Sequence, residues 1–296
     1  MAVSIASPSV SAAVSPRNKD CLAVLLPKHP QKTPAGLSSG VFFRLLFCFA
    51  LPVFLAPPVA ADCQVDGRRE VVAVATVHDG DTLRLKDGRR VRVIGINAPE
   101  TAARGRPAEA LAAPATQFAR RFVGREITLV YDRESQDRYG RTLAHVFSKE
   151  GRSLAAAVLQ EGLAFPVAVP PNLAAADCFA GRADKARKSG KGVWSHRSWL
   201  ASEVKSLSAD VAGFQRVRGK VTKISGSRDI WLEMDGAVVL KIAAADRRYF
   251  ADKQWLAWKG RTIEVQGWLV SRPDAARKGF KPLQLQVRTP YAVTVL

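Results

Sequence analysis

The sequence predicts a mainly β protein with helices, in which a five-stranded OB-fold barrel is followed by a second small OB-like β-barrel. Three observations support this fold class. Short runs rich in β-branched residues recur over 71–148 and again from residue 214 onward. Asp87-Gly88 is a typical hairpin turn between two of these runs. Segments with helical spacing interrupt the first set of strands, as in a small closed barrel with a crossing helix.

The first barrel is expected to contain five strands and about three helices. The strands are predicted at 71–77, 82–86, 90–96, 126–132 and 142–148. Pro114 suits the first turn of a helix that ends near Val123, because proline lacks the N–H that this turn leaves unpaired. A second helix is expected over 153–160. Asn172 is expected to cap a third helix that runs through Lys188.

The remaining pattern divides the chain into four parts. We expect a signal segment over 1–61, the five-stranded OB-fold barrel domain over 62–200, a polar linker over 201–213, and an accessory β-barrel over 214–296. Six strand-like runs separated by Gly, Asp and Pro predict the accessory barrel. One short helix is expected within 244–257.

Residues 1–61 have the features of an export signal. Arg44 precedes an apolar run that prolines interrupt, and the run ends in Val-Ala-Ala. Small residues at these positions predict cleavage after Ala61 and a periplasmic or secreted protein. The run is short for a membrane span, so no stable insertion is expected after cleavage.

The basic charge belongs to the part that remains after cleavage. The full chain has 45 Lys and Arg against 26 Asp and Glu, a net charge of +19. Residues 1–61 hold five of these basic residues and one acid, which leaves 40 basic and 25 acidic residues. This excess favours a polyanionic partner, either nucleic acid or anionic lipid, and does not select a fold.

Two of the four cysteines, Cys63 and Cys178, lie beyond the expected cleavage point. An exported protein with two cysteines most often pairs them, so we expect a disulfide, with two buried free thiols as the alternative. In the chain-entropy model, closing a loop of about 100 residues stabilises a fold by about 4 to 5 kcal/mol.

Three short segments carry side chains that suit a phosphate or metal site. Asp79 and Asp81 are close enough in sequence to repel each other unless a cation lies between them. Arg92 alternates with valines in a predicted strand, and Glu100 follows a stiff turn from which a carboxylate can activate water. Arg141 ends an Asp-Arg-Tyr-Gly-Arg turn, and its planar guanidinium matches phosphate oxygens. Each segment also has a plainer interpretation. Asp79 and Asp81 can be solvated acids of a turn, Arg92 a solvated residue on the barrel surface, and Arg141 part of a basic hairpin end.

The order of these segments resembles the staphylococcal nuclease-like (thermonuclease) family over 68–195. The matching segments are HDGDT, VRVIGINAPE, DRYGRTLAHV, LQEGLA and GKGVW. The resemblance implies an OB-fold phosphodiesterase that uses one Ca²⁺ ion to cut DNA, RNA or both, with single strands favoured.

The resemblance also implies which residues bind the metal. The calcium ligands would be Asp81, Asn97 and the backbone carbonyl of Ala98. Asp79 would not contact the ion but would position these ligands. Asn97 stands where the family usually has an aspartate. The missing negative charge should lower the affinity for Ca²⁺ or change the cation preference.

Catalytic and substrate-binding roles follow in the same way. Glu100 would be the general base, Arg92 and Arg141 would hold the scissile phosphate, and Arg138 and Tyr139 would contact the substrate. The family's pocket also uses two tyrosines after the LQEGLA segment, and their approximate equivalents here cannot stack on a base.

Tryptophans in the predicted accessory barrel have two interpretations. Near basic residues they can stack on unpaired bases, but large aromatics in a small barrel are more often core, which we expect for most of these. They are Trp231, Trp255, Trp258 and Trp268.

The sequence therefore favours an exported, calcium-dependent nuclease with an accessory barrel that helps to hold nucleic acid. The alternative is a nucleic-acid-binding protein on a nuclease fold, with catalysis weakened or lost through Asn97. A basic envelope protein that binds only other proteins is a third hypothesis. Oligomeric state is not predicted.

Overall fold

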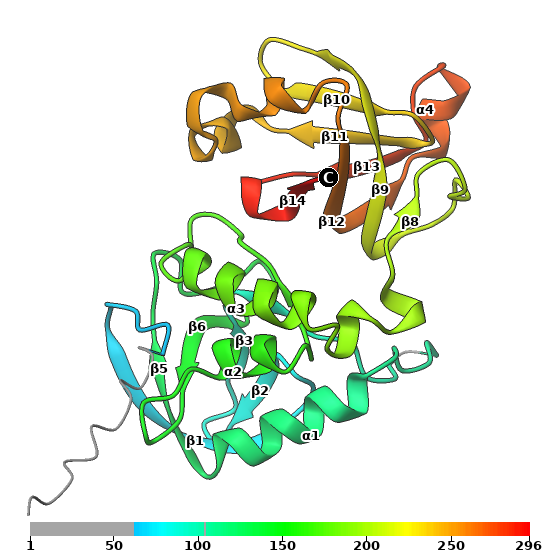
Figure 1. The fold of residues 1–296 in the computed structure, drawn as a ribbon. Coiled ribbons are helices and arrows are strands. Elements are labelled where there is room, and N and C mark those ends of the chain that lie inside the picture. The colour runs from blue at the N-terminus through cyan, green and yellow to red at the C-terminus, as the bar shows by residue number, and fades with distance from the viewer. Residues whose placement is uncertain (1–61, 104) are drawn as a thin grey trace, which may run out of the picture. The chain divides into compact units, whose positions relative to one another are not determined.

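The computed structural model describes residues 62–103 and 105–296 (Figure 1). The predicted signal segment and its cleavage point lie outside the described residues. Within the described ranges, no helix combines the length and the apolar character that a bilayer-crossing helix requires.

The first barrel closes in the order β1-β2-β3-β6-β5. Its strands are β1 (Arg69–Val77), β2 (Thr82–Leu85), β3 (Arg90–Val93), β5 (Glu126–Val130) and β6 (Thr142–Phe147). Neighbouring strands are antiparallel except β3 and β6, which run parallel. This closed five-stranded arrangement confirms the predicted barrel, with strand ends within a few residues of those expected.

Three helices accompany the first barrel (Figure 1). They are α1 (Ala112–Val123), α2 (Leu154–Gln160) and α3 (Ala176–Lys188). The Ser153 side chain caps α2 by accepting a hydrogen bond from the amide of Ala156. Asn172, the expected cap of α3, lies before this helix and instead exchanges two hydrogen bonds with the backbone of Glu134. The prediction for Asn172 was wrong because its amide bridges two loops.

Cys63 and Cys178 form the disulfide that the sequence predicted, with Cα atoms 5.6 Å apart. Cys178 lies in the first turn of α3 and Cys63 lies before β1. The bond therefore ties the helix to the start of the barrel.

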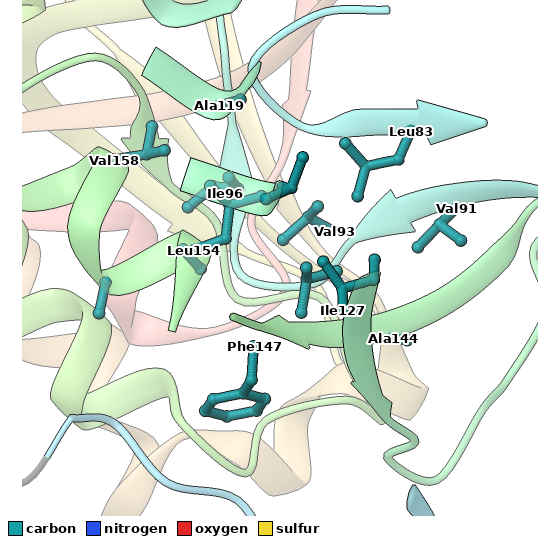
Figure 2. Close-up of a cluster of buried hydrophobic side chains, with 14 of the residues drawn as sticks. Leu83, Val91, Val93, Ile96, Ala119, Ile127, Ala144, Phe147, Leu154 and Val158 are labelled. Atoms are coloured by element: carbon teal, nitrogen blue, oxygen red, sulfur yellow. The ribbon is translucent and has the colours of Figure 1, made fainter. Parts of the chain in front are cut away.

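The interior of the barrel is filled by aliphatic side chains that alternate with exposed ones along the strands. Val91 and Val93 on β3 point inward, whereas Arg92 between them does not. Figure 2 shows the inward side chains together with Leu154 and Val158 of α2. Because strands and helices share one cluster, packing fixes the helices against the barrel.

The second barrel repeats this connectivity. Its strands are β9 (Gly213–Ser225), β10 (Ile230–Met234), β11 (Val238–Ile242), β12 (Thr262–Ser271) and β13 (Leu283–Gln286). They follow the order β12-β13-β11-β10-β9, and β12 also pairs with β9, which closes the barrel. As in the first barrel, the third and fifth of its strands are parallel. The predicted OB-like fold is confirmed.

Short elements complete the second barrel. Strands β8 (Ser202–Glu203) and β14 (Val293–Val295) extend its edges, and α4 (Pro273–Arg277) lies between β12 and β13. Two 3-10 segments, η3 (Ala244–Tyr249) and η4 (Ala251–Trp258), stand where one short helix was expected.

The four tryptophans of this region divide evenly between core and surface. Trp255 and Trp258 are buried against the ring of Phe250. Trp231 is partly exposed, and Trp268 is 47% exposed on β12. Core is therefore the right assignment for two of them, and two remain available to a ligand.

Candidate active site

The turn between β1 and β2 holds Asp79 and Asp81, and both carboxylates are buried. Asp79 Oδ1 accepts a hydrogen bond of 2.9 Å from the amide of Asp81. Gly80 lies between them, and a Cβ atom there would come within 2.6 Å of the Ala98 Cβ atom. Glycine is needed because the turn packs directly on the segment that carries Ala98.

Asp81 is held by three neighbours. Its Oδ2 atom accepts a 2.6 Å hydrogen bond from the amide of Ala98 and lies 3.0 Å from Arg92 Nη1. Its Oδ1 atom accepts from the hydroxyl of Thr82 at 3.0 Å. Burial raises the pKa of Asp81 to about 6, against the opposing charge of Arg92. A nearby cation therefore stabilises the ionised carboxylate.

Asn97 reaches the same guanidinium from another strand. Gly95, with a φ angle of 92°, turns the chain out of β3 and into β4 (Ile96–Asn97), which pairs with β7 (Phe165–Pro166). Arg92 Nη2 then donates to Asn97 Oδ1 at 3.2 Å, and Nη1 donates to the Ile96 carbonyl at 2.8 Å. One arginine thus holds oxygen atoms of Asp81 and Asn97 on a single guanidinium.

These oxygens suit a hard divalent cation by their chemistry. Carboxylate, amide and carbonyl oxygens are the ligands that Ca²⁺ prefers. Within the ranges that the structure describes, however, no three His, Cys, Asp or Glu side chains gather as a metal-binding group. Asp81 and Asn97 would provide a single negative charge for a cation, and both already contact the Arg92 guanidinium.

Glu100 is exposed and lies near Asp81 and Arg92. Its amide donates to Glu109 Oε2 at 2.8 Å, while its own carboxylate makes no hydrogen bond to any described residue. Partial loss of hydration, followed by the negative charge of Asp81, raises the pKa of Glu100, and Arg92 opposes this rise. The carboxylate is therefore close to Asp81 and Arg92 and remains able to contact water.

The turn before β6 positions Arg141. Asp137 accepts hydrogen bonds from the backbone amide of Arg141 at 2.9 Å and from its Nε atom at 2.7 Å. These contacts leave both terminal nitrogens of the guanidinium without a partner among the described residues. Arg138 Nη2 donates to the hydroxyl of Tyr139 at 2.7 Å, and the Tyr139 side chain is 60% exposed.

One cavity of about 610 Å³ collects four of the predicted residues, namely Arg92, Arg138, Tyr139 and Arg141. Arg92 lies on β3, and Arg141 directly precedes β6, the parallel neighbour of β3, so the two side chains start from adjacent positions. The buried oxygens of Asp81 and Asn97 adjoin the cavity through Arg92. Glu100 is not part of its lining.

Trp268 and Arg288 of the second barrel also line this cavity, and the sequence predicted neither of them there. The Trp268 ring packs edge-on against its cross-strand partner Phe214, with ring centroids 5.2 Å apart. Alternation along β12 is a signal that Trp268 faces outward. No signal in the sequence relates it to the cavity of the first barrel.

An OB-fold barrel with two arginines at one cavity, one of them paired with a buried carboxylate and an amide, defines a class of proteins with a basic site suited to a phosphate group. Residues 90–196 match the family described as "Staphylococcal nuclease homologue". The chain belongs to this family, as its similarity to individual proteins also shows.

Three similar proteins illustrate the relationship. The chain is 35% identical over 145 residues to the thermonuclease of Staphylococcus intermedius, covering 46% of this chain and 84% of that protein. It is 33% identical over 138 residues to the thermonuclease of Staphylococcus hyicus, covering 44% and 79%. It is 30% identical over 125 residues to an uncharacterized endonuclease of Escherichia coli, covering 41% and 69%. The predicted family is confirmed, and the second barrel lies beyond the matched family range.

Proposed function

We propose that this chain is an exported, calcium-dependent nuclease that hydrolyses phosphodiester bonds of DNA, RNA or both, with single strands favoured. The observation that carries the proposal is the convergence of Arg92 and Arg141 on one cavity, with Arg92 also paired to Asp81. Membership of the staphylococcal nuclease homologue family and similarity to two thermonucleases support phosphodiester hydrolysis.

The two arginines bind and orient the phosphate. Guanidinium groups donate paired hydrogen bonds to non-bridging phosphate oxygens and offset the charge that grows on them during hydrolysis. Arg92 is held in place by Asp81, Asn97 and the Ile96 carbonyl before any substrate arrives. Such preorganised charge stabilises a transition state without further rearrangement.

Glu100 takes a proton from the attacking water. Its carboxylate has no competing hydrogen bond among the described residues, and its raised pKa makes it a stronger base than an ordinary glutamate. Asp81, Asn97 and the Ala98 carbonyl would hold Ca²⁺, with Asp79 fixing the turn behind them. The bound ion would add positive charge to the phosphate site.

Export and domain organisation belong to the same proposal. The apolar run ending at Ala61 supports cleavage there, and a disulfide is typical of periplasmic or secreted proteins. We assign the nuclease to residues 62–200 and an accessory barrel to residues 214–296.

A nucleic-acid-binding protein without catalysis is the second candidate function. Asn97 favours it, since an amide provides one negative charge fewer for a metal ion than an aspartate. Under this alternative the basic cavity binds the substrate, but cleavage is weak or absent.

Incubation of single-stranded DNA with the protein, in Ca²⁺ or in chelator, separates these functions. The nuclease is expected to cut in Ca²⁺, to stop in chelator and to lose activity as Glu100→Gln. The matched control is Glu126→Gln, which should cut normally because Glu126 is exposed at the start of β5 and does not line the cavity. DNA retention without cleavage would favour the second candidate, and no binding at low salt would exclude both.

A further inference from the structure

Three neighbouring strands of the second barrel present a continuous outward face. Ser225, Trp231 and Lys241 lie side by side across β9, β10 and β11 because they are register partners. Lys223, Glu233 and Val239 form a second row of partners beside the first. Cross-strand neighbours on one face lie close enough to contact a common ligand.

The connection from β12 to β13, which contains α4, borders this face and forms a groove with it. The groove has a volume of about 420 Å³, within the usual range for a ligand site. Its lining residues include charged and aromatic side chains from the strands and from the connection. Those used below are Lys223, Trp231, Glu233, Arg272, Phe280 and Lys281.

The charge of the groove is positive and only partly balanced. Lys223 Nζ lies 3.1 Å from Glu233 Oε1, so these two charges offset each other. Arg272 donates to the amide oxygen of Gln284, and Lys281 donates to the Gly236 carbonyl at 2.7 Å. Both acceptors are neutral. Within the described residues, Arg272 and Lys281 therefore face the groove without a carboxylate partner.

Two aromatic side chains accompany these cations. Trp231 is partly exposed, with Lys241 Nζ 5.1 Å and Arg272 Cζ 5.9 Å from its ring centroid. Phe280 is 67% exposed and contacts no other ring in the part of the chain that the structure describes. One exposed phenylalanine is ordinary on a protein surface, but here it borders the same groove as a tryptophan and two unbalanced cations.

We infer that this groove binds single-stranded nucleic acid, with bases stacking on Trp231 and Phe280 and phosphates contacting Arg272 and Lys281. Stacking aromatics beside unbalanced cations are the combination that recognises an unpaired strand. OB-type barrels bind oligonucleotides on the face made by their second and third strands and the adjoining loops, and the groove occupies this face. The inference rests on the proposed function only in taking nucleic acid as the partner, because no catalytic residue contributes to the groove.

The test measures binding without cleavage. A fluorescently labelled dodecamer of thymidylate and an abasic strand of the same length are titrated with the full chain in chelator at low salt, and anisotropy is recorded. Phe280→Ala and Trp231→Ala are each expected to weaken thymidylate binding about 5- to 100-fold. Binding of the abasic strand should change little. Lys281→Ala should weaken both strands, because phosphate contacts do not depend on bases.

Matched controls lie on the same barrel outside the groove. Leu256→Ala removes an exposed apolar side chain, and Lys259→Ala removes an exposed charge, both at the end of η4. Neither is expected to alter binding. Phe280→Ala is expected to fold normally, because a side chain that is 67% exposed contributes little to the core. Trp231→Phe should retain most of the thymidylate affinity.

The possible outcomes separate this inference from the proposed nuclease. Unchanged thymidylate binding in both aromatic variants would overturn the inference even if the unaltered protein cuts DNA in Ca²⁺. Equal losses for thymidylate and abasic strands would also overturn it, because the groove would then be a general polyanion surface. Selective loss of thymidylate binding would support the inference even if the unaltered protein proved unable to cleave.

Discussion

Arg92 Nη1 lies 3.0 Å from Asp81 Oδ2, and both side chains are largely buried. An enclosed carboxylate is stable in its charged form only beside a positive charge. The same guanidinium also lines the cavity to which Arg141 contributes. The Asp81–Arg92 pair therefore connects the proposed metal ligands to the proposed phosphate-binding arginines.

Asp81→Asn should reveal whether this connection serves catalysis. We expect kcat/KM for single-stranded DNA to fall at least ~100-fold, because one charged contact in such a site contributes a few kcal/mol. Half-saturating Ca²⁺ should rise as well. Initial rates across a Ca²⁺ titration measure both quantities. A variant with an unchanged Ca²⁺ requirement would assign Asp81 a structural role.

Asn97→Asp tests the chain's departure from the family pattern. The substitution restores a negative charge beside Arg92 Nη2, 3.2 Å from the present amide oxygen. A cation bound between Asp81 and residue 97 should gain from the added charge, so half-saturating Ca²⁺ is expected to fall about 10-fold or more. Isothermal titration with Ca²⁺ alone provides a readout independent of activity. Unchanged affinity would mean that Asn97 is not a ligand.

Trp268 adds a second aromatic side chain to the cavity, which Tyr139 of the first barrel also lines. The approximate equivalents of the family's tyrosines are Ala168 and Pro170, which cannot stack on a base. We expect Trp268→Ala to raise KM for single-stranded DNA about 5- to 100-fold with a smaller effect on kcat, and Trp268→Phe to recover most of the loss. Val270→Ala, two residues along the same strand and 53% exposed, is the control. Equal KM values for all three variants would leave Trp268 outside the substrate path.

Local chemistry made most of the first barrel predictable from the sequence. Hairpin turns, β-branched runs and glycines placed its strands within a few residues, and four of the site residues predicted from motif order line one cavity. The pairing of Arg92 with both Asp81 and Asn97 was not predictable, because it depends on how three separate segments fold against one another. Likewise, the sequence left Trp268 with two interpretations, core or ligand-facing, and did not show what lies opposite it. The predicted helix cap at Asn172 was wrong because an asparagine suited to capping can equally well form hydrogen bonds with other backbone groups.

Glu264 is buried and pairs with three arginines, of which only Arg216 is buried, and it is expected to matter for stability. Arg216 donates to its Oε1 atom, Arg218 Nη2 lies 3.2 Å from Oε2, and Arg187 of α3 lies 3.1 Å from Oε1. Glu264→Ala leaves buried arginine charge uncompensated, which should lower the free energy of unfolding by about 3 to 5 kcal/mol. Glu203→Ala, an exposed acid 3.8 Å from Arg218, should change it by less than about 1 kcal/mol. Urea unfolding measures the free energy of unfolding of both variants. Equal losses would contradict a special role for buried Glu264.

His145 should make folding stability depend on pH. Its ring is buried, its nitrogens have no hydrogen-bond partner among the described residues, and Nε2 lies 3.7 Å from Asp132 Oδ2, beyond hydrogen-bond distance. Burial lowers the pKa of His145, and the charge of Asp132 only partly opposes this. Below a pH of about 6.5, the unfolded chain therefore binds a proton that the folded protein does not.

The stability contributed by neutral His145 is thus present above about pH 6.5 and is lost as the pH falls, by at most about 1.4 kcal/mol per pH unit. His145→Gln should remove this component, so the drop in unfolding free energy between pH 7.5 and pH 5.5 should be smaller in the variant. Urea titrations in chelator at the two pH values measure it, and the other histidines contribute equally to both proteins. An identical drop in both would mean that His145 takes up its proton equally readily in the folded and unfolded states, so that burial does not hold it neutral.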